Sequence, residues 1–326
     1  MLALLTVSGC EEKQKVVVVY TAVDQVYSDV IFREFEEETG IRVKAVYDTE
    51  ANKTTGLVNR ILAEKDKPVC DVFWNNEFIQ TIALKEEGML QPYYSKEASD
   101  IPEAYKDPEG YWTAFGGRAR VMLVNTDLLS EEEYPDSVYD LINGSFDGKE
   151  IALAYPMFGT TRTQAAALYA YMGPEEGREF FEKVADCGIQ IVDGNSVTKD
   201  MAAAGQVAIG YTDTDDAKEA IEDGAPVAMV FPDQGENGMG TLITPNTVAM
   251  IAGASHTEEA KQFIDYVVTR QMEEHLMEMG FFDLSVREDG TEDGFSVKGM
   301  EISLNDIYKQ LEQASMDMQE IFSQAH

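Results

Sequence analysis

Short apolar runs alternate along the first third of the chain with stretches in which apolar residues recur every three or four positions. The continuous β-branched run at 16–20 predicts a buried strand. The spacing of the apolar residues at 27–35 predicts an amphipathic helix, which Gly40 is placed to end. Further strands are expected at 41–47 and 71–74, and further helices at 57–62 and 78–83. This β-α-β-α-β-α order indicates a parallel sheet with right-handed crossovers.

The second half of the chain repeats this alternation. Strands are expected at 151–155, 189–192, 207–211 and 227–231, and helices at 163–172, from Ser255 to about Met272, and at 303–315. Ser255 and Glu258 form the capping box that is expected to open the second of these helices. Two glycine-containing segments, 110–125 and 241–251, are interpreted as the passages between two lobes. The predicted division is 16–114 plus 245–290 for lobe one and 118–240 plus 291–326 for lobe two.

Polar side chains follow the predicted strands of both lobes. In an open α/β sheet such turns lie at the carboxyl ends of the strands, where ligands bind. The alternative for each residue is that it caps the helix that follows. The candidate ligand-binding residues are Thr21, Asp24, Gln25, Asn75 and Asn76 in lobe one, and Gly159, Thr160, Thr161, Asp213 and Thr214 in lobe two.

The turn after 207–211 is the richest in oxygen ligands, because five consecutive side chains from Thr212 to Asp216 carry them. Capping needs one or two such residues, and Asp216 with Glu219 resembles a capping box. At least one of the others is therefore expected to contact a ligand. Asp213 is the candidate metal ligand.

A second turn, Gly159-Thr160-Thr161, places glycine and hydroxyl groups at the start of the Ala-rich helix. Free N–H groups at a helix N-terminus hold anions, although an ordinary N-cap has the same composition. The P-loop signature is absent. Arg118 and Arg120 share one face of their strand by the period of two, and pairing with surface acids is the plain interpretation.

Composition and charge narrow the classes of partner. The 326 residues carry 60 acidic and 25 basic side chains, a formal net charge of −35, which argues against nucleic acid as a partner. The histidines are scattered and no Cys/His metal spacing occurs. No nucleophile–base arrangement is visible, so no catalytic residue is expected. Cys70 and Cys187 adjoin apolar runs and are expected to be buried free thiols, with a disulfide left open.

The N-terminus has a short apolar run that ends at a cysteine. Val7-Ser8-Gly9-Cys10 is similar to a bacterial lipobox, and the run before it is too short to span a membrane. We therefore expect residues 1–10 to be a lipoprotein signal that ends at Cys10, with Cys10 as the lipid anchor. The positively charged start that a signal peptide usually has is missing, and a chance cysteine in a tail is the alternative.

Several segments together resemble one known family, the ferric-type (family 1) extracellular solute-binding proteins of bacterial ABC importers. The segments are 20–25, 71–77, 110–113, 158–161 and 212–217, and the resemblance runs through nearly the whole mature chain. It implies a class II periplasmic-binding-protein fold, with two α/β lobes whose parallel-rich sheets are joined by two crossing strands. Such lobes close around a small ligand. The family also implies an extracytoplasmic monomer that serves an ABC permease and ATPase.

This chain departs from the ferric members of that family at the ligand positions. Those members present adjacent tyrosines in the second lobe, often with a histidine and a glutamate in the first. In this sequence Asp213 and Thr214 stand where the tyrosine pair would be, and Tyr211 is the nearby phenol and a further candidate ligand. Asp24 or Gln25 stands near the histidine position and Asn76 near the glutamate position.

The expected function is the capture of ferric iron with an anion in the cleft between the lobes, without a cofactor. The ferric ion or the anion would be the transported ligand. One alternative is a binding protein for a small phosphonate or phosphate ester such as 2-aminoethylphosphonate, because Gly159–Thr161 matches the anion-binding segment of the family. The others are a two-lobed α/β enzyme and a receptor domain that presents a ligand to a sensor.

Overall fold

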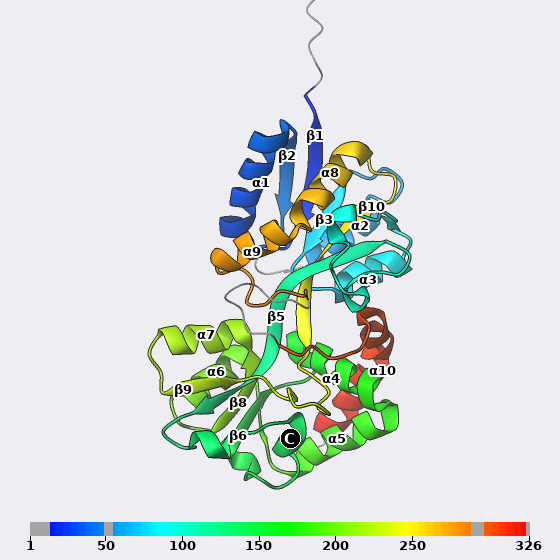
Figure 1. Ribbon diagram of the computed structural model, residues 1–326. Helices are drawn as coiled ribbons and strands as arrows, with labels where there is room; N and C mark the ends of the chain where they lie inside the picture. The colour runs from blue at the N-terminus through cyan, green and yellow to red at the C-terminus, as the bar shows by residue number, and fades with distance from the viewer. Residues whose placement is uncertain (1–13, 49–54, 288–296, 324–326) are drawn as a thin grey trace, which may run out of the picture.

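The computed structural model describes residues 14–48, 55–287 and 297–323, and they form two lobes joined by the strands β5 and β10 (Figure 1). One continuous set of ten strands runs through both lobes in the order β2-β1-β3-β10-β5-β8-β6-β7, with β4 paired to β10 and β9 to β5. The predicted two-lobed α/β fold with two crossing strands is confirmed.

The first lobe is built on three parallel strands whose carboxyl ends point toward the second lobe (Figure 1). Both faces of β1 are buried, which explains its unbroken run of valines. Gly40 ends α1 in the left-handed conformation, with φ of 71°. The elements are β1 (Val16–Thr21), α1 (Gln25–Thr39), β2 (Arg42–Tyr47), α2 (Thr55–Ala63), β3 (Val72–Asn75), α3 (Ile79–Glu86), β4 (Leu90–Gln91), α8 (Thr257–Val267) and α9 (Arg270–Glu278).

The second lobe has its own parallel strands, β7-β6-β8, and helices on both faces. The C-terminal helix α10 packs on α4 and α5 through Ile307 and Leu311, and it also contacts α3 of the first lobe. The elements are β6 (Ile151–Ala154), α4 (Gly159–Met172), α5 (Pro174–Asp186), β7 (Gln190–Val192), α6 (Asn195–Ala203), β8 (Ile209–Asp213), α7 (Thr214–Glu222), β9 (Val227–Val230) and α10 (Leu304–Ser323).

The two crossing strands are β5 (Trp112–Asn125) and β10 (Ile243–Ile251), which pair antiparallel where the lobes meet. The sequence predicted a passage between the lobes at 110–125, and within it β5 continues unbroken through Gly116 and Gly117. Asn246 pairs with Phe115 and Pro245 with Gly117, so Gly116 is the extra residue of a β-bulge. Gly116 has φ of 45°, and a Cβ there would lie 2.1 Å from the Phe282 ring. Only glycine fits this point of the crossing.

Three local predictions are wrong. The helix expected from Ser255 to Met272 is divided into α8 and α9, because Thr269 accepts a hydrogen bond from Met272 N and begins a new helix. His256 rather than Ser255 is the N-cap of α8. Cys70 is buried, as expected, but Cys187 is exposed because it ends α5 at the surface.

The numerical limits of the two lobes stay a prediction. Within the described ranges, no helix is long and apolar enough to cross a bilayer. Cys10 and the lipobox lie outside the described residues. Short 3₁₀ helices occupy Lys96–Ala98, Glu103–Tyr105, Glu131–Glu133, Val138–Leu141 and Gly148–Glu150.

Candidate functional site

Three helices begin at the same edge of the second lobe, each directly or shortly after a parallel strand. α4 begins at Gly159 after β6, α6 begins at Asn195 after β7, and α7 begins at Thr214 after β8. Because β6, β7 and β8 are parallel, their carboxyl ends lie together, and this edge faces the first lobe (Figure 1).

Arg120 on the crossing strand β5 joins these three turns. Its side chain is fully buried, and Nη1 donates to Asp213 Oδ1 at 2.8 Å, Asn195 Oδ1 at 3.1 Å and Thr160 Oγ1 at 3.2 Å. Nη2 donates to the carbonyl oxygen of Tyr211 at 3.2 Å. A guanidinium group is suited to this task because its planar fork has several donors and a permanent charge.

The acceptors around Arg120 are also bonded to one another. Thr160 Oγ1 donates to Asp213 Oδ2 at 2.6 Å, and Asn195 Nδ2 donates to the same oxygen and to Thr160 Oγ1, both at 2.9 Å. Thr161 Oγ1 donates to Asn195 Oδ1 at 3.2 Å. We call these five residues, Arg120, Thr160, Thr161, Asn195 and Asp213, the Arg120 network.

The Arg120 network contains one full positive and one full negative charge, so these charges compensate each other. None of the N-cap residues Phe158, Gly194 and Asp213 makes a side-chain cap hydrogen bond to its own helix. Three helix N-termini therefore present uncapped N–H groups and the positive ends of their dipoles toward one edge. Arg120 Nε also has no hydrogen-bond partner among the described residues. This arrangement favours an anion.

The predicted capping box of Asp216 with Glu219 is wrong, because α7 begins earlier, at Thr214, with Asp213 as its N-cap. The Asp213 carboxylate bonds to Arg120, Thr160 and Asn195 instead of the helix. β8 extends to Asp213, which brings this carboxylate to the side of β5.

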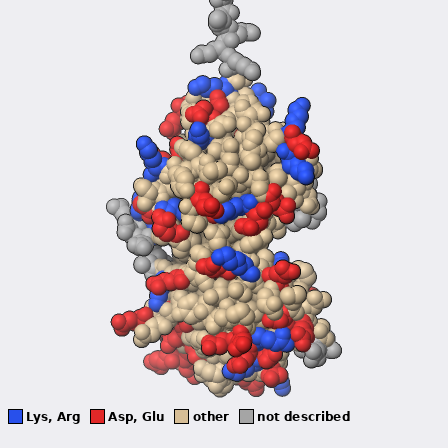
Figure 2. Space-filling model, turned by 90° about the vertical axis from the view of Figure 1, so that its right-hand side faces the viewer, with Lys and Arg blue, Asp and Glu red and all other residues tan. Residues whose placement is uncertain are grey.

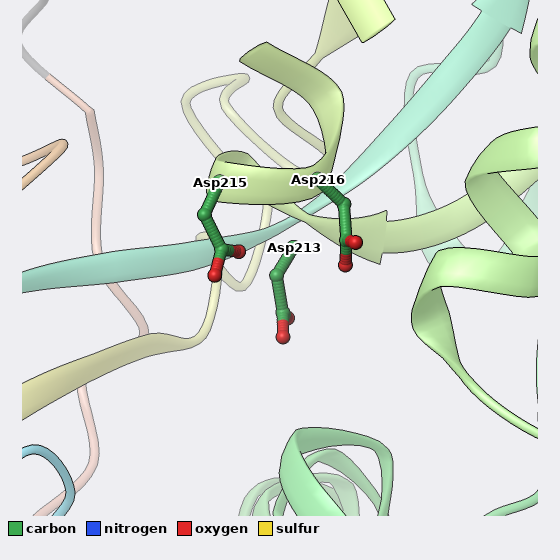
Figure 3. Close-up of side chains that lie close together, drawn as sticks. All are labelled: Asp213, Asp215 and Asp216. Carbon is green, nitrogen blue, oxygen red and sulfur yellow. The ribbon is translucent and has the colours of Figure 1, made fainter. Parts of the chain in front are cut away.

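Three carboxylates of this turn lie close together (Figure 3). Asp213, Asp215 and Asp216 each offer an oxygen within 4.8 Å of the others. Arg118 pairs with Asp215 at 2.7 Å, as Arg120 does with Asp213, so two of the three charges are compensated. Burial raises the pKa of Asp216 to about 6, against the hydrogen bond from Thr212. The group is thus less anionic than its sequence indicates.

Tyr211 lies below Arg120, whose guanidinium carbon is 4.8 Å from the centre of the phenol ring. The side chain is buried, and this burial raises the pKa of Tyr211. Ligation of ferric iron needs the ionised phenolate, which burial disfavours. The carbonyl oxygen of Tyr211, rather than its phenol, contributes to the Arg120 network.

The candidate residues of lobe one lie at the facing ends of β1 and β3. Thr21 is buried and accepts from Val23 N at 3.0 Å, while Asp24 and Gln25 are exposed at the start of α1. Asn75 is buried and its Oδ1 has no partner among the described residues, and Asn76 is half-buried. No hydrogen bond between described residues joins this group to the Arg120 network.

Two residues of the Arg120 network were not predicted to belong to the site. Arg120 was placed on the correct face of its strand, but its acid partner is buried and 93 residues away. Asn195 follows Gly194 at the start of a helix, a signal that was available. Glu77, in the polar turn after β3, accepts from Ile79 N at 2.5 Å and Gln80 N at 2.9 Å in the first turn of α3, and burial raises its pKa.

A cavity with a volume of about 620 Å³ bridges the lobes. It lies between α3 and α10 and reaches the start of α4 at Met157 and Arg162. Its lining carries charges of both signs, and Lys85 and Lys309 are paired with acidic side chains. Figure 2 shows that Lys and Arg side chains are interspersed with Asp and Glu over this face, at the waist as elsewhere.

Comparison with known proteins gives concordant matches. Residues 67–295 match a family model described as "Bacterial extracellular solute-binding protein". Iron uptake protein A1 of Synechocystis is 24% identical over 264 residues, which cover 77% of this chain and 70% of that protein. The Trichodesmium protein IdiA (FutA), solved in complex with iron and citrate, superposes with a TM-score of 0.82 at 20% identity, covering 94% of this chain and 99% of that one. AfuA of Actinobacillus pleuropneumoniae, solved with fructose-6-phosphate, gives a TM-score of 0.66 at 21% identity, covering 96% and 98%.

Proposed function

Since the chain belongs to the bacterial extracellular solute-binding proteins, of the ferric type that serves ABC importers, we propose that it captures a small solute with a phosphate or phosphonate group between its lobes. The observation that carries this proposal is the convergence of three uncapped helix N-termini on the Arg120 network. The protein would then deliver the solute to an ABC permease and its ATPase.

The chemistry of the edge suits a tetrahedral oxyanion. The N–H groups at the start of α4, from Gly159 to Thr161, are donors of the kind that bind phosphate. Arg120 compensates Asp213, so this carboxylate does not repel an anion. The fold relative from Actinobacillus pleuropneumoniae was solved with fructose-6-phosphate, which supports an organic phosphate as the solute class.

A second candidate is ferric iron together with an anion. Relatives named as iron uptake or Fe(3+)-binding proteins favour it, and so does the proximity of Asp213, Asp215 and Asp216. Hard carboxylate oxygens are ligands that ferric iron accepts. Two of these carboxylates are paired with arginines and Tyr211 is buried, so the metal would have to displace existing ion pairs. The geometry therefore supports the organic phosphate or phosphonate better.

Calorimetry of the purified protein with 2-aminoethylphosphonate, inorganic phosphate and ferric citrate tests the proposal. We expect the phosphonate or phosphate to bind, and Asn195→Ala to weaken that binding about tenfold, because a hydrogen bond to a charged group contributes about 1.5–3 kcal/mol. Asn143→Ala is the matched control, since Asn143 is exposed and its side chain bonds only locally, to Asp140 and Ser145. Binding of ferric citrate alone, with no response to Asn195→Ala, would overturn the proposal in favour of iron.

The role in transport is proposed to need no catalysis and no cofactor, with the protein acting as a monomer outside the cytoplasm. Turnover of any of the three probes would contradict this. Cys10 is proposed to carry the lipid anchor, and Cys10→Ser should then release the protein from the membrane fraction, because a buried acyl chain contributes about 0.8 kcal/mol per methylene. A Cys10→Ser variant that stays in the membrane fraction would remove the anchor from the proposal.

A further inference from the structure

The segment 281–287, which follows α9, lies against the crossing strand β5 beside the bulge. Asp283 N and Leu284 N donate to the carbonyl oxygen of Gly117 at 2.9 and 3.0 Å, and Gly117 N donates back to Leu284 O at 2.9 Å. Phe282 packs edge-on against Phe115, with ring centres 5.6 Å apart. The segment is therefore a third element, besides β5 and β10, at the place where the lobes are joined.

Glu273 of α9 fastens this segment to the first lobe. The side chain is 1% exposed, and Oε1 accepts from Gly116 N at 2.6 Å and from Val286 N at 2.9 Å. The Arg287 guanidinium pairs with the other oxygen and also donates to Val268 O at 2.7 Å. One buried carboxylate thus holds both the bulge glycine and the segment.

Asp283 carries the connection into the second lobe. Its carboxylate is 8% exposed and accepts from Thr214 Oγ1 at 2.6 Å, and the Lys218 ammonium group lies 2.5 Å from it. Thr214 Oγ1 in turn accepts from Ala119 N of β5 at 3.2 Å. These contacts attach the first turn of α7 to the crossing strand and to the segment from lobe one. Asp213 of the Arg120 network is the N-cap of the same helix.

We propose that Asp283 is a positioning residue that holds the first turn of α7 to the hinge, so that the Arg120 network and the crossing strands move as one unit. Asp283 does not contact the solute. Asp283 limits the angles that the two lobes adopt in the absence of solute. It also keeps the second-lobe edge, which carries the Arg120 network, in the orientation that binds the solute. The effect on affinity rests on the proposed function, whereas the effect on the lobe angle does not.

The lobe angle is measured in the solute-free protein by electron–electron double resonance. Nitroxide labels at Glu37→Cys on α1 and Glu179→Cys on α5, both exposed, report the distance between the lobes in a Cys10→Ser, Cys187→Ser background. Lys218→Met and Asp283→Asn should each broaden the distance distribution. Lys218→Arg, which keeps the charge, should restore the parental width.

Lys199→Met is the matched control for these variants. Lys199 pairs with Glu219 of the same helix α7 at 2.6 Å, but it links α7 to α6 inside the second lobe. The distance distribution of the Lys199→Met variant should equal that of the parent. If Lys218→Met gives the same distribution as Lys199→Met, the proposal is overturned. Because Lys218 is partly exposed, Lys218→Met is expected to fold, and it tests the positioning role of Asp283 even if Asp283→Asn does not fold.

Affinity gives the second readout. Titration of the parent, Lys218→Met and Lys199→Met with 2-aminoethylphosphonate and inorganic phosphate should show about a three- to tenfold loss in Lys218→Met only, because a smaller fraction of the protein is competent to bind. The melting temperatures should stay close to one another. A broadened distribution in a protein that binds neither probe would refute the proposed function and leave Asp283 in its positioning role. An unchanged distribution with normal binding would refute the positioning role alone.

Discussion

Arg120 decides the electrostatics of the second-lobe edge, because it is the cation that compensates the buried carboxylate of Asp213. The sequence analysis placed Arg120 on the right face and gave surface pairing as its plain interpretation. The side chain is instead fully buried, and its partner comes from another strand. Strand period fixes the face of a residue, but burial on that face depends on which strand becomes the neighbour.

Arg120→Met should destabilise the protein by about 3–5 kcal/mol, because it leaves Asp213 buried without its partner. Arg118→Met is the control, since the Arg118–Asp215 pair is 33% and 51% exposed and its loss should cost at most about 1 kcal/mol. Urea unfolding of the two variants measures both values. Equal losses would show that Arg120 is not the buried cation of the site.

Asp216 makes the stability of the native state depend on pH, with a sign opposite to that of a carboxylate in an ordinary salt bridge. Burial raises its pKa to about 6 from 3.8, so the folded state binds the proton more tightly than the unfolded state. This group therefore lowers the stability of the native state as pH rises from about 4 to about 6. Asp216→Asn removes the dependence, and at about pH 7 the variant should be more stable than the parent by about 1 kcal/mol after allowance for solvent screening.

Urea unfolding at about pH 4 and about pH 7 tests this prediction. The control is Asp306→Asn, because Lys309 and Ser303 lower the pKa of Asp306 and its loss should reduce stability at the higher pH. If Asp216→Asn changes stability in the same direction as Asp306→Asn at the higher pH, then Asp216 is not the destabilising carboxylate.

At the scale of elements, the strand–helix alternation was predictable because each element has a local signal. The valine run of β1 and the period of α1 depend only on which faces are buried. Helix starts were less predictable, because several residues in one turn are able to cap. Asp213 is engaged by Arg120 from another element, and Thr269 begins α9 within a continuous apolar pattern. These outcomes depend on tertiary contacts that a local pattern does not contain.

Gly159 sets the direction of the first turn of α4. Its φ is 54° and no atom lies within 4 Å of an added Cβ, so Gly159→Ala should introduce backbone strain without a clash. The strain should cost about 1–2 kcal/mol, and relief of it should turn the following N–H groups away from the edge. We expect about tenfold weaker binding of 2-aminoethylphosphonate, which corresponds to 1.4 kcal/mol.

Gly224→Ala is the matched variant for this test. Gly224 has φ of 78°, also has no atom near an added Cβ, and follows α7 at its far end. Calorimetry and thermal unfolding should show similar losses of stability in the two variants and a loss of affinity in Gly159→Ala alone. Equal affinities would remove the start of α4 from the binding edge.

In the whole molecule, the edge that carries the Arg120 network faces the first lobe, and the strands β5 and β10 join the two lobes (Figure 1). The sequence predicted two crossing strands from their glycines, but not that Gly116 is a bulge held by Glu273 from α9. The pair is 157 residues apart, and a buried Glu in a helix has no local signature of its target. Ion pairs between elements, such as that of Arg120 with Asp213, also determine the charge at the second-lobe edge, which composition and net charge do not show.

The lobes should close when solute binds, and the closure should turn on the crossing at Gly116. Small-angle scattering should show a smaller radius of gyration at saturating 2-aminoethylphosphonate than in the solute-free protein. Gly116→Ala places a Cβ 2.1 Å from the Phe282 ring, so it should cost about 1–3 kcal/mol of stability and reduce the contraction. The scattering measurement therefore tests whether a local clash at Gly116 reduces the contraction of the whole molecule.

Gly40→Ala separates the clash from general backbone strain. Gly40 has φ of 71° at the end of α1, where no atom lies within 4 Å of an added Cβ, so that variant should be strained but should contract like the parent. If Gly116→Ala and Gly40→Ala contract equally, the bulge is not the point of rotation. If the parent keeps its radius of gyration while calorimetry shows the solute bound, the lobes do not close at all. Only a contraction that Gly116→Ala reduces and Gly40→Ala preserves locates the hinge at the Gly116 bulge.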